Sequence, residues 1–186
     1  MLDTVKSRIN GIDTAALADT AEAVANDPKK GRVRFDVTTR WTGQTRSETT
    51  VEAYNLAGNK IVRAHKIVAD EPCELLGSDS APNPQELLMA AFNACITVGY
   101  VAGASVRGIT LEALEITTSG QLDLRGFLGL DEAVSPGYDA LDFEVRIKGD
   151  GTPQQFEDIH QAVLRTSPNY FNLSQPIRLN GSLKLG

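Results

Sequence analysis

The chain has few side chains that could do chemistry. It contains two cysteines, Cys73 and Cys95, and two histidines, His65 and His160. This scarcity excludes a disulfide-rich scaffold and a zinc site built from repeated cysteines and histidines. No metal ion or other cofactor is expected. Any nucleophilic chemistry at sulfur therefore depends on one of two thiols.

The two cysteines lie in different surroundings. Cys95 sits near the middle of residues 87–106, a stretch of 20 residues without a charged side chain. A cysteine in the middle of a helix gets no help from the helix dipole, so a thiolate there needs a nearby cation or hydrogen-bond donor. Cys73 follows Asp70-Glu71-Pro72 and precedes Glu74, and acidic neighbours disfavour a thiolate. The alternative to a reactive thiolate is, for Cys95, a buried and unreactive thiol, and for Cys73, a partly exposed and unreactive thiol.

Neither histidine has a pattern of its own. His65 alternates with neighbours along a predicted strand, and His160 lies beside the apolar face of the last predicted helix. Both are expected to be structural or surface residues. The chain contains no Gly-x-Ser-x-Gly elbow, no P-loop and no Gly-x-Gly-x-x-Gly fingerprint, so hydrolase, nucleotide triphosphatase and dinucleotide-binding functions have no support.

Alternating apolar and polar residues predict the strands that would position these groups. Three fall in the first half of the chain and three in the second: 32–38, 46–54, 60–69, 109–123, 138–148 and 176–185.

Capping residues predict three helices. Asp13 precedes the first, over 14–25; Asn83-Pro84 precedes the second, which ends near Val106; and Thr152-Pro153 precedes the third, which ends near Thr166. Strands grouped between helices, in the order βββ–α–ββ–α–β, indicate an α+β fold with a largely antiparallel sheet of about six strands. Residues 1–30 are expected to be a helical extension, and residues 31–186 the main domain.

The uncharged helix has two interpretations. Its length fits a membrane span, and Gly99 and Gly103 have the spacing of small residues at membrane helix interfaces. However, it is rich in Ala and Gly, and no Lys/Arg cluster or aromatic belt flanks it. A buried central helix in a protein without membrane contact is therefore favoured.

The charge composition limits the kinds of partner that the chain is expected to bind. The 24 acidic residues exceed the 18 basic ones and give a net charge of -6, which is unsuited to binding nucleic acid. The N-terminus lacks the apolar segment of an export signal, so a reducing cytoplasm is the expected location.

One block of residues resembles a known family. Residues 70–72, Leu76-Gly77, and the run from Pro82-Asn83-Pro84 to Ala94-Cys95 are similar to the OsmC/Ohr family, and the order of elements is similar too. The resemblance covers roughly residues 32–186. It implies an intertwined homodimer with two sites at the subunit interface. It also implies that the helix cysteine reduces an organic hydroperoxide, that a second cysteine before a proline forms a disulfide with it, and that thiols reduce that disulfide.

Carried over to this chain, the resemblance assigns the attacking role to Cys95. It assigns the role of the Arg that holds the thiolate to Arg46, and the helix-start Glu corresponds to Gln85, with Glu86 as its neighbour. Glu86 should not point the same way as residue 85, since one helical step rotates a side chain by about 100°.

The position of the second cysteine is occupied by Ser167, which cannot form a disulfide. Three outcomes stay open. Cys95 works alone with an external thiol, Cys73 replaces the missing partner, or the chain is a catalytically silent dimer that binds an apolar small molecule at the subunit interface.

Overall fold

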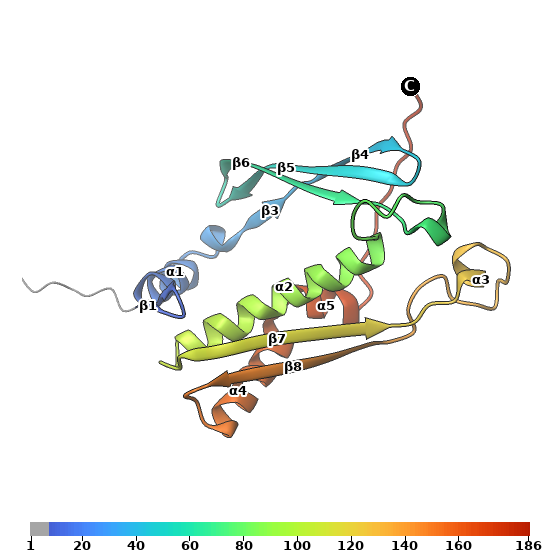
Figure 1. Cartoon of the computed structure of the whole chain (residues 1–186). Coiled ribbons are helices and arrows are strands. Elements are labelled where there is room, and N and C mark those ends of the chain that lie inside the picture. The colour runs from blue at the N-terminus through green and yellow to red at the C-terminus, as the bar shows by residue number, and fades with distance from the viewer. Residues whose placement is uncertain (1–7) are drawn as a thin grey trace, which may run out of the picture. The chain divides into compact units, whose positions relative to one another are not determined.

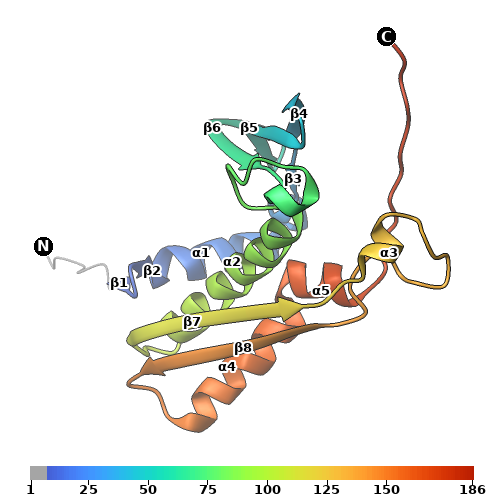
Figure 2. The same ribbon diagram turned by 45° about the vertical axis from the view of Figure 1, so that its right-hand side comes forward.

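The computed structural model describes residues 8–186, and the chain divides into two compact units (Figures 1 and 2). The first unit ends at Ala90 and the second begins at Ala91, so the boundary falls inside a single helix. The predicted division at residues 30 and 31 remains a prediction. The mixed helices and antiparallel strands confirm the α+β class.

The first described elements are a small hairpin and a helix. Strands β1 (Arg8–Ile9) and β2 (Ile12–Asp13) pair with each other, and α1 (Thr14–Asn26) follows at once. Asp13 Oδ1 accepts a hydrogen bond of 3.0 Å from the Ala16 N–H, so Asp13 is the predicted N-cap. After α1 comes a short 3-10 turn, η1 (Pro28–Gly31).

A four-stranded antiparallel sheet completes most of the first unit. Its strands are β3 (Val33–Phe35), β4 (Thr38–Gly43), β5 (Arg46–Leu56) and β6 (Asn59–Ala69). The strand β5 pairs with β6 along one edge and with β3 and β4 along the other. Ala57 and Gly58, which join β5 to β6, have positive φ angles of 52° and 85°, as a tight hairpin turn requires.

The sheet differs from its prediction in two ways. The sequence predicted three strands here, and β4 is an additional one. The alternation in residues 32–38 also predicted a half-buried strand, yet Val33 and Phe35 are exposed, Phe35 to 63%. Among the described residues of this unit, Val51 is the one buried apolar side chain, so the sheet has little within the unit to pack against.

The loop after β6 leads through the 3-10 turn η2 (Cys73–Leu75) into the long helix α2 (Pro84–Ser105). The predicted capping of α2 is confirmed. The Glu86 N–H donates to Asn83 Oδ1, and the Asn83 N–H donates to Glu86 Oε2, each at 2.8 Å. This reciprocal pair satisfies two amide groups that a helix start leaves without partners.

Apolar burial on α2 is confined to one stripe. The buried apolar side chains are four residues apart: Phe92, Ile96, Tyr100 and Ala104; the polar residue Ser105 is also buried, at the end of the helix. Val98, which lies off this stripe, is 67% exposed. Among the described helices, α2 is long and apolar enough to cross a membrane, although a core helix of a soluble protein has the same length and composition. The predicted burial of this helix therefore holds for one of its faces within a single chain.

The second unit has a layered core. Strands β7 (Leu111–Gly120) and β8 (Leu141–Gly149) form an antiparallel hairpin, and α2 and α4 (Pro153–Thr166) pack on the same face of it (Figures 1 and 2). Thr152 and Gln155 form a capping box at the start of α4, as predicted. The buried core residues of this unit are Phe92, Ile96, Tyr100, Ala104, Ile109, Ile159 and Val163.

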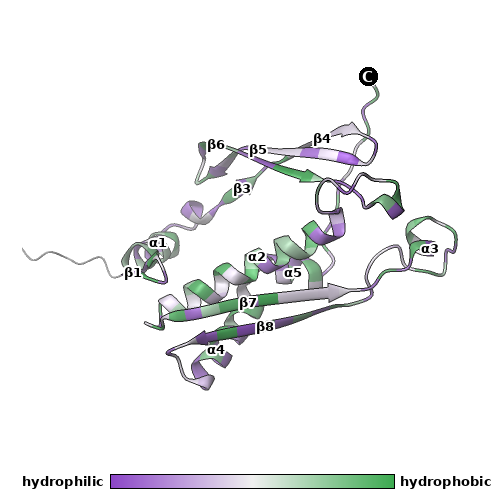
Figure 3. Cartoon of the chain, viewed as in Figure 1, coloured by the Kyte–Doolittle hydropathy of each residue, from purple (hydrophilic) through white to green (hydrophobic). Residues whose placement is uncertain are grey.

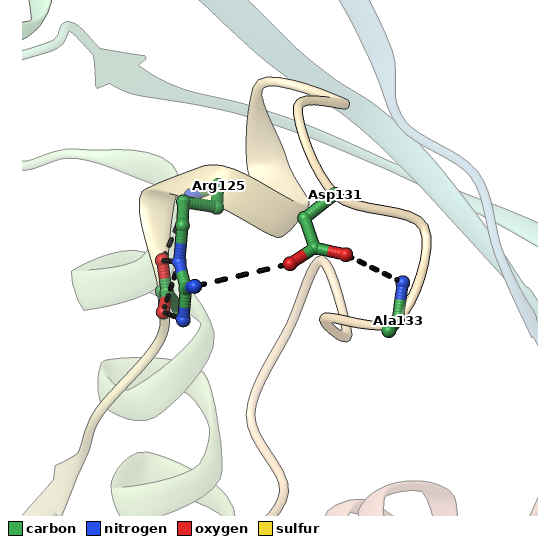
Figure 4. Close-up of polar contacts among 4 residues, drawn as sticks. Arg125, Asp131 and Ala133 are labelled. Atoms are coloured by element: carbon green, nitrogen blue, oxygen red, sulfur yellow. Dashed lines mark hydrogen bonds and ion pairs between the residues drawn. The ribbon is translucent and has the colours of Figure 1, made fainter.

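The connection between β7 and β8 carries a short helix, α3 (Leu124–Phe127), where the sequence indicated a Gly-rich loop. Arg125 donates to both carboxylate oxygens of Asp123. Its Nη1 also lies 3.8 Å from Asp131, which accepts a hydrogen bond from the Ala133 N–H (Figure 4). The apolar side chains of α3 nevertheless face solvent, and Figure 3 shows their hydrophobic colour.

The predicted sixth strand is not formed. A short helix, α5 (Pro168–Ser174), follows α4, and residues 176–185 have no regular structure. Their alternating apolar side chains, such as Leu179 and Leu183, are exposed. A strand needs a neighbour to bond its backbone groups, and no strand pairing includes these residues in the described part of the chain.

Candidate functional site

The structure brings Cys95 and Ser167 together. The Cys95 sulfur lies 3.4 Å from Ser167 Oγ, although the two residues are 72 positions apart in the chain. Ser167 is 7% exposed and Cys95 is half-buried, so Cys95 keeps partial access to solvent. The candidate nucleophile Cys95 therefore contacts Ser167, the residue at the position where the resemblance expects a second cysteine.

Helix packing explains this contact. Residues spaced by four lie on one face of a helix, and Cys95, Gly99 and Gly103 have that spacing on α2. A Cβ added to Gly103 would lie 3.1 Å from Ile159 Cγ2, and one added to Gly99 would lie 3.0 Å from Val163 Cγ2. The two helices are thus as close as the glycines allow. Ile159, Val163 and Ser167 have the same spacing of four, so Ser167 meets Cys95 at the next step of this antiparallel register.

Two further contacts hold Ser167 in place. Ser167 is the N-cap of α5, and its Oγ accepts a hydrogen bond of 3.2 Å from the Tyr170 N–H. Asn169 Nδ2 donates to the carbonyl oxygen of Ala91 at 2.9 Å. Ala91 lies one helical turn before Cys95, so the start of α5 is tied to the turn of α2 that carries the cysteine. Sequence reasoning missed Asn169, and its place two residues after Ser167 was the available signal.

Next to this register lies the pair of Tyr100 and His160. The hydroxyl of the buried Tyr100 lies 2.5 Å from His160 Nδ1. Burial, together with the charge of Glu157, raises the pKa of Tyr100 to about 12. The pair opens on a hollow of about 390 Å³ whose lining includes Phe143 and Phe156. His160 is thus hydrogen-bonded within the second unit, and its structural role stays a prediction.

The other predicted site residues belong to the first unit. Arg46 is the first residue of β5, Gln85 is half-buried in the first turn of α2, and Cys73 is exposed in η2. Glu86 forms the capping hydrogen bonds with Asn83 through its N–H and Oε2, and its catalytic role stays a prediction.

Asp70 anchors the loop that carries Cys73. Its carboxylate is 1% exposed and accepts hydrogen bonds from the hydroxyls of Ser78 (2.6 Å), Thr45 (2.7 Å) and Ser80 (2.7 Å). Three backbone N–H groups, of Glu71, Ser78 and Ser80, also donate to it. These hydrogen bonds, those of Ser78 and Thr45 foremost, hold the pKa of Asp70 far below its usual range.

The loop also closes tightly on itself. A Cβ added to Gly77 would lie 1.7 Å from the Glu71 carbonyl oxygen, so no other residue fits there without a backbone shift.

Within residues 8–186, no group of three or more His, Cys, Asp or Glu side chains could hold a metal ion.

Comparison with known proteins shows which family the sequence matches. A family model described as OsmC-like protein matches residues 77–181, which is more than half of the chain. A search of curated protein sequences finds no match.

Solved structures share the fold. An OsmC-like protein from Mycoplasma pneumoniae is similar at 14% identity, with a TM-score of 0.57 over 76% of this chain and 87% of that one. A putative osmotic stress induced and detoxification response protein from Psychrobacter arcticus is similar at 13% identity, with a TM-score of 0.54 over 72% and 84%. An OsmC-like protein of unknown function from Vibrio cholerae is similar at 15% identity, with a TM-score of 0.51 over 74% and 91%.

Proposed function

The chain belongs to the OsmC-like protein family, and we propose that it reduces organic hydroperoxides through Cys95 with a soluble thiol as reductant. The contact of 3.4 Å between Cys95 and residue 167 carries the proposal. Cys95 thus lies beside the position that the family resemblance assigns to a second cysteine, and this supports an attacking role for Cys95. This proximity supports a thiol site at Cys95, although a second thiol is missing at residue 167.

The proposed cycle has three steps. The Cys95 thiolate attacks the outer peroxide oxygen, the O–O bond breaks, and the leaving alkoxide takes a proton from water, so the products are a sulfenic acid at Cys95 and an alcohol. A small thiol then condenses with the sulfenic acid, which releases water and leaves a mixed disulfide. A second thiol displaces Cys95 and restores it, with a small-molecule disulfide as the product. A reducing cytoplasm supplies such thiols, and we propose that location for the chain.

Arg46 is the proposed partner of the thiolate, because a guanidinium keeps its charge at any physiological pH. Gln85 stands where the resemblance expects a glutamate, and an amide can donate a hydrogen bond to a peroxide oxygen without carrying a charge. Cys73 is the alternative resolving thiol. It is an exposed free thiol in η2, and a disulfide with Cys95 would resolve the sulfenic acid.

The proposal is tested with cumene hydroperoxide and dimedone, which traps sulfenic acids. Mass spectrometry should find the label on Cys95 in the wild type and in Cys73→Ser, and no label in Cys95→Ser. Turnover with added dithiothreitol should persist in Cys73→Ser. A Cys95 that stays unlabelled in excess hydroperoxide would rule out the peroxidase function, and turnover lost in Cys73→Ser would make Cys73 the resolving thiol.

A gain of function offers a second test. Ser167→Cys should form a disulfide with Cys95 after one equivalent of hydroperoxide, because the present contact already brings the two side chains within reach. The disulfide would protect the sulfur from dimedone. Non-reducing peptide mapping after digestion locates it.

A catalytically silent binding protein is the second candidate. Ser167 favours it, since no disulfide can form there, and so does the apolar lining of the hollow beside Tyr100 and His160. The expected ligand is a small apolar molecule. Native mass spectrometry of the purified protein should then show added mass, while the dimedone test is negative.

We also propose that the chain works as a homodimer. The apolar side chains Phe35 and Trp41 of the first unit are exposed in a single chain, as are those of residues 176–185. Exposed apolar surface of this extent is typical of protein interfaces. Light scattering after gel filtration should give twice the chain mass, and Phe35→Ser with Trp41→Ser should shift the protein toward the monomer.

A further inference from the structure

The hydroxyl of Ser167 has one hydrogen to donate, and the Cys95 sulfur lies within reach of it. Ser167 Oγ accepts a hydrogen bond from the Tyr170 N–H, which occupies a lone pair and not the hydrogen. The Cys95 sulfur, 3.4 Å away, is the other hydrogen-bond partner of this oxygen. The burial of Ser167 reduces competition from water for the same hydrogen.

The ionisation of Cys95 decides which atom donates. A neutral thiol and a hydroxyl can each donate to the other, so the bond favours neither direction. A thiolate has no hydrogen and can only accept, and hydrogen bonds to charged groups are about twice as strong as those between neutral groups. The contact therefore stabilises the thiolate of Cys95 more than its thiol.

The donor is also held in place before any reaction. Ser167 caps α5, Asn169 binds the Ala91 carbonyl one turn before Cys95, and the close approach at Gly99 sets the distance between α2 and α4. Little conformational freedom is lost when Ser167 donates, so most of the hydrogen-bond energy acts on the sulfur.

We infer that Ser167 is a hydrogen-bond donor that stabilises the reactive thiolate of Cys95, and is not an inert replacement for a second cysteine. This inference rests on the proposed function only for its purpose, because the hydrogen bond itself is independent of the substrate. Serine at this position would make Cys95 a more reactive single thiol and would leave the resolving step to the soluble thiol.

The test uses the full chain with Cys73→Ser, so that Cys95 is its single thiol. Two readouts are followed at pH 7: the ultraviolet absorbance of the thiolate, and the rate of alkylation by iodoacetamide, measured by mass spectrometry. Ser167→Ala should lower the thiolate absorbance and slow alkylation by about fivefold. Ser167→Thr keeps a hydroxyl at the same place and should stay within about twofold of the parent.

A matched control separates this effect from loss of a helix cap. Thr152→Ala removes the N-cap of α4 without touching Cys95, and it should leave both readouts unchanged. Equal alkylation rates in Ser167→Ala and its parent would overturn the inference, as would a rate lowered equally in Ser167→Thr or in Thr152→Ala.

These readouts require no hydroperoxide. If Ser167→Ala slows alkylation but Cys95 ignores cumene hydroperoxide, the hydrogen bond stands and the proposed peroxidase function fails. If Cys95 forms a sulfenic acid with hydroperoxide but is alkylated at equal rates in the parent and in Ser167→Ala, the function stands and the inference fails.

Discussion

The two units of the chain are held together in different ways. In the second unit, seven buried apolar residues from α2, α4 and the segment between α2 and β7 form a continuous core. In the described part of the first unit, the buried side chains are Val51 and the carboxylate of Asp70, and the sheet exposes Phe35 and Trp41. One unit thus relies on apolar packing within the chain and the other on hydrogen bonds around one acid. Cys95 therefore lies in the unit that has an apolar core of its own within a single chain.

The largest expected effect tests the apolar core. Ile159→Ala should lower the free energy of unfolding by about 2–5 kcal/mol, because Ile159 is fully buried and its loss leaves a cavity between α4 and α2. Urea unfolding monitored by circular dichroism measures the change. Val98→Ala, on the exposed side of α2, should stay within about 0.5 kcal/mol of the wild type. A loss at Val98 as large as that at Ile159 would mean that the outer face of α2 is covered in solution.

The next effect tests the polar anchor of the first unit. Asp70→Asn should lower the thermal unfolding midpoint by several degrees, because an amide has one acceptor oxygen where six donors now converge. Asp79→Asn, in the same loop but exposed, is the control and should have little effect. An unchanged midpoint in Asp70→Asn would show that the loop does not depend on this carboxylate.

Asp70 also predicts a dependence on pH. Its folded pKa is lowered, so its contribution to stability is present above the pKa of the unfolded state, near 4, and is lost as the pH falls below that value. The wild type should therefore lose more stability than Asp70→Asn between about pH 4 and pH 2. Thermal melts across that range compare the two proteins.

A smaller effect is expected for the polar pair inside the second unit. Tyr100→Phe removes the hydrogen bond to His160 and should cost about 1 kcal/mol at neutral pH. The pKa of Tyr100 is raised from 10.0 to about 12, so its contribution is present below pH 10 and is lost as the pH rises toward 12. The stability of Tyr100→Phe should fall less over that interval in urea unfolding. Parallel curves for the two proteins would contradict the assignment.

The smallest effect is expected in the loop between β7 and β8. Arg125→Gln should leave the thermal midpoint unchanged within error, because the ion pairs of Arg125 with Asp123 and Asp131 are exposed to solvent. A clear loss would show that this loop contributes to the second unit as the core does.

Local signals predicted the elements better than their surroundings. The caps at Asp13, Asn83 and Thr152 predicted three helix starts, because a cap depends on residues adjacent in the chain. The strand predicted over 176–185 did not form, since a strand depends on a partner that the alternation pattern does not identify.

The candidate site was predicted in part. Cys95 was identified because it is a cysteine within the motif. Ser167 was identified because it stands where the resemblance expects a second cysteine. Their contact could not be predicted from either residue alone, because it depends on how closely α2 and α4 approach. Gly99 and Gly103 were the signal of this close approach. Their spacing fitted both a membrane helix interface and a buried helix in the sequence analysis. The structure shows that they face Val163 and Ile159.

The shared spacing of four on α2 and α4 has a consequence for how this chain can change in length. Insertions or deletions in the connection that carries α3 leave the facing pairs of the two helices unaltered, since that connection lies outside both. A single residue inserted between Ile159 and Ser167 would instead turn residue 167 by about 100° around α4 and carry its hydroxyl away from the sulfur. Length variation among relatives should therefore be frequent between β7 and β8 and nearly absent within the last two turns of α4.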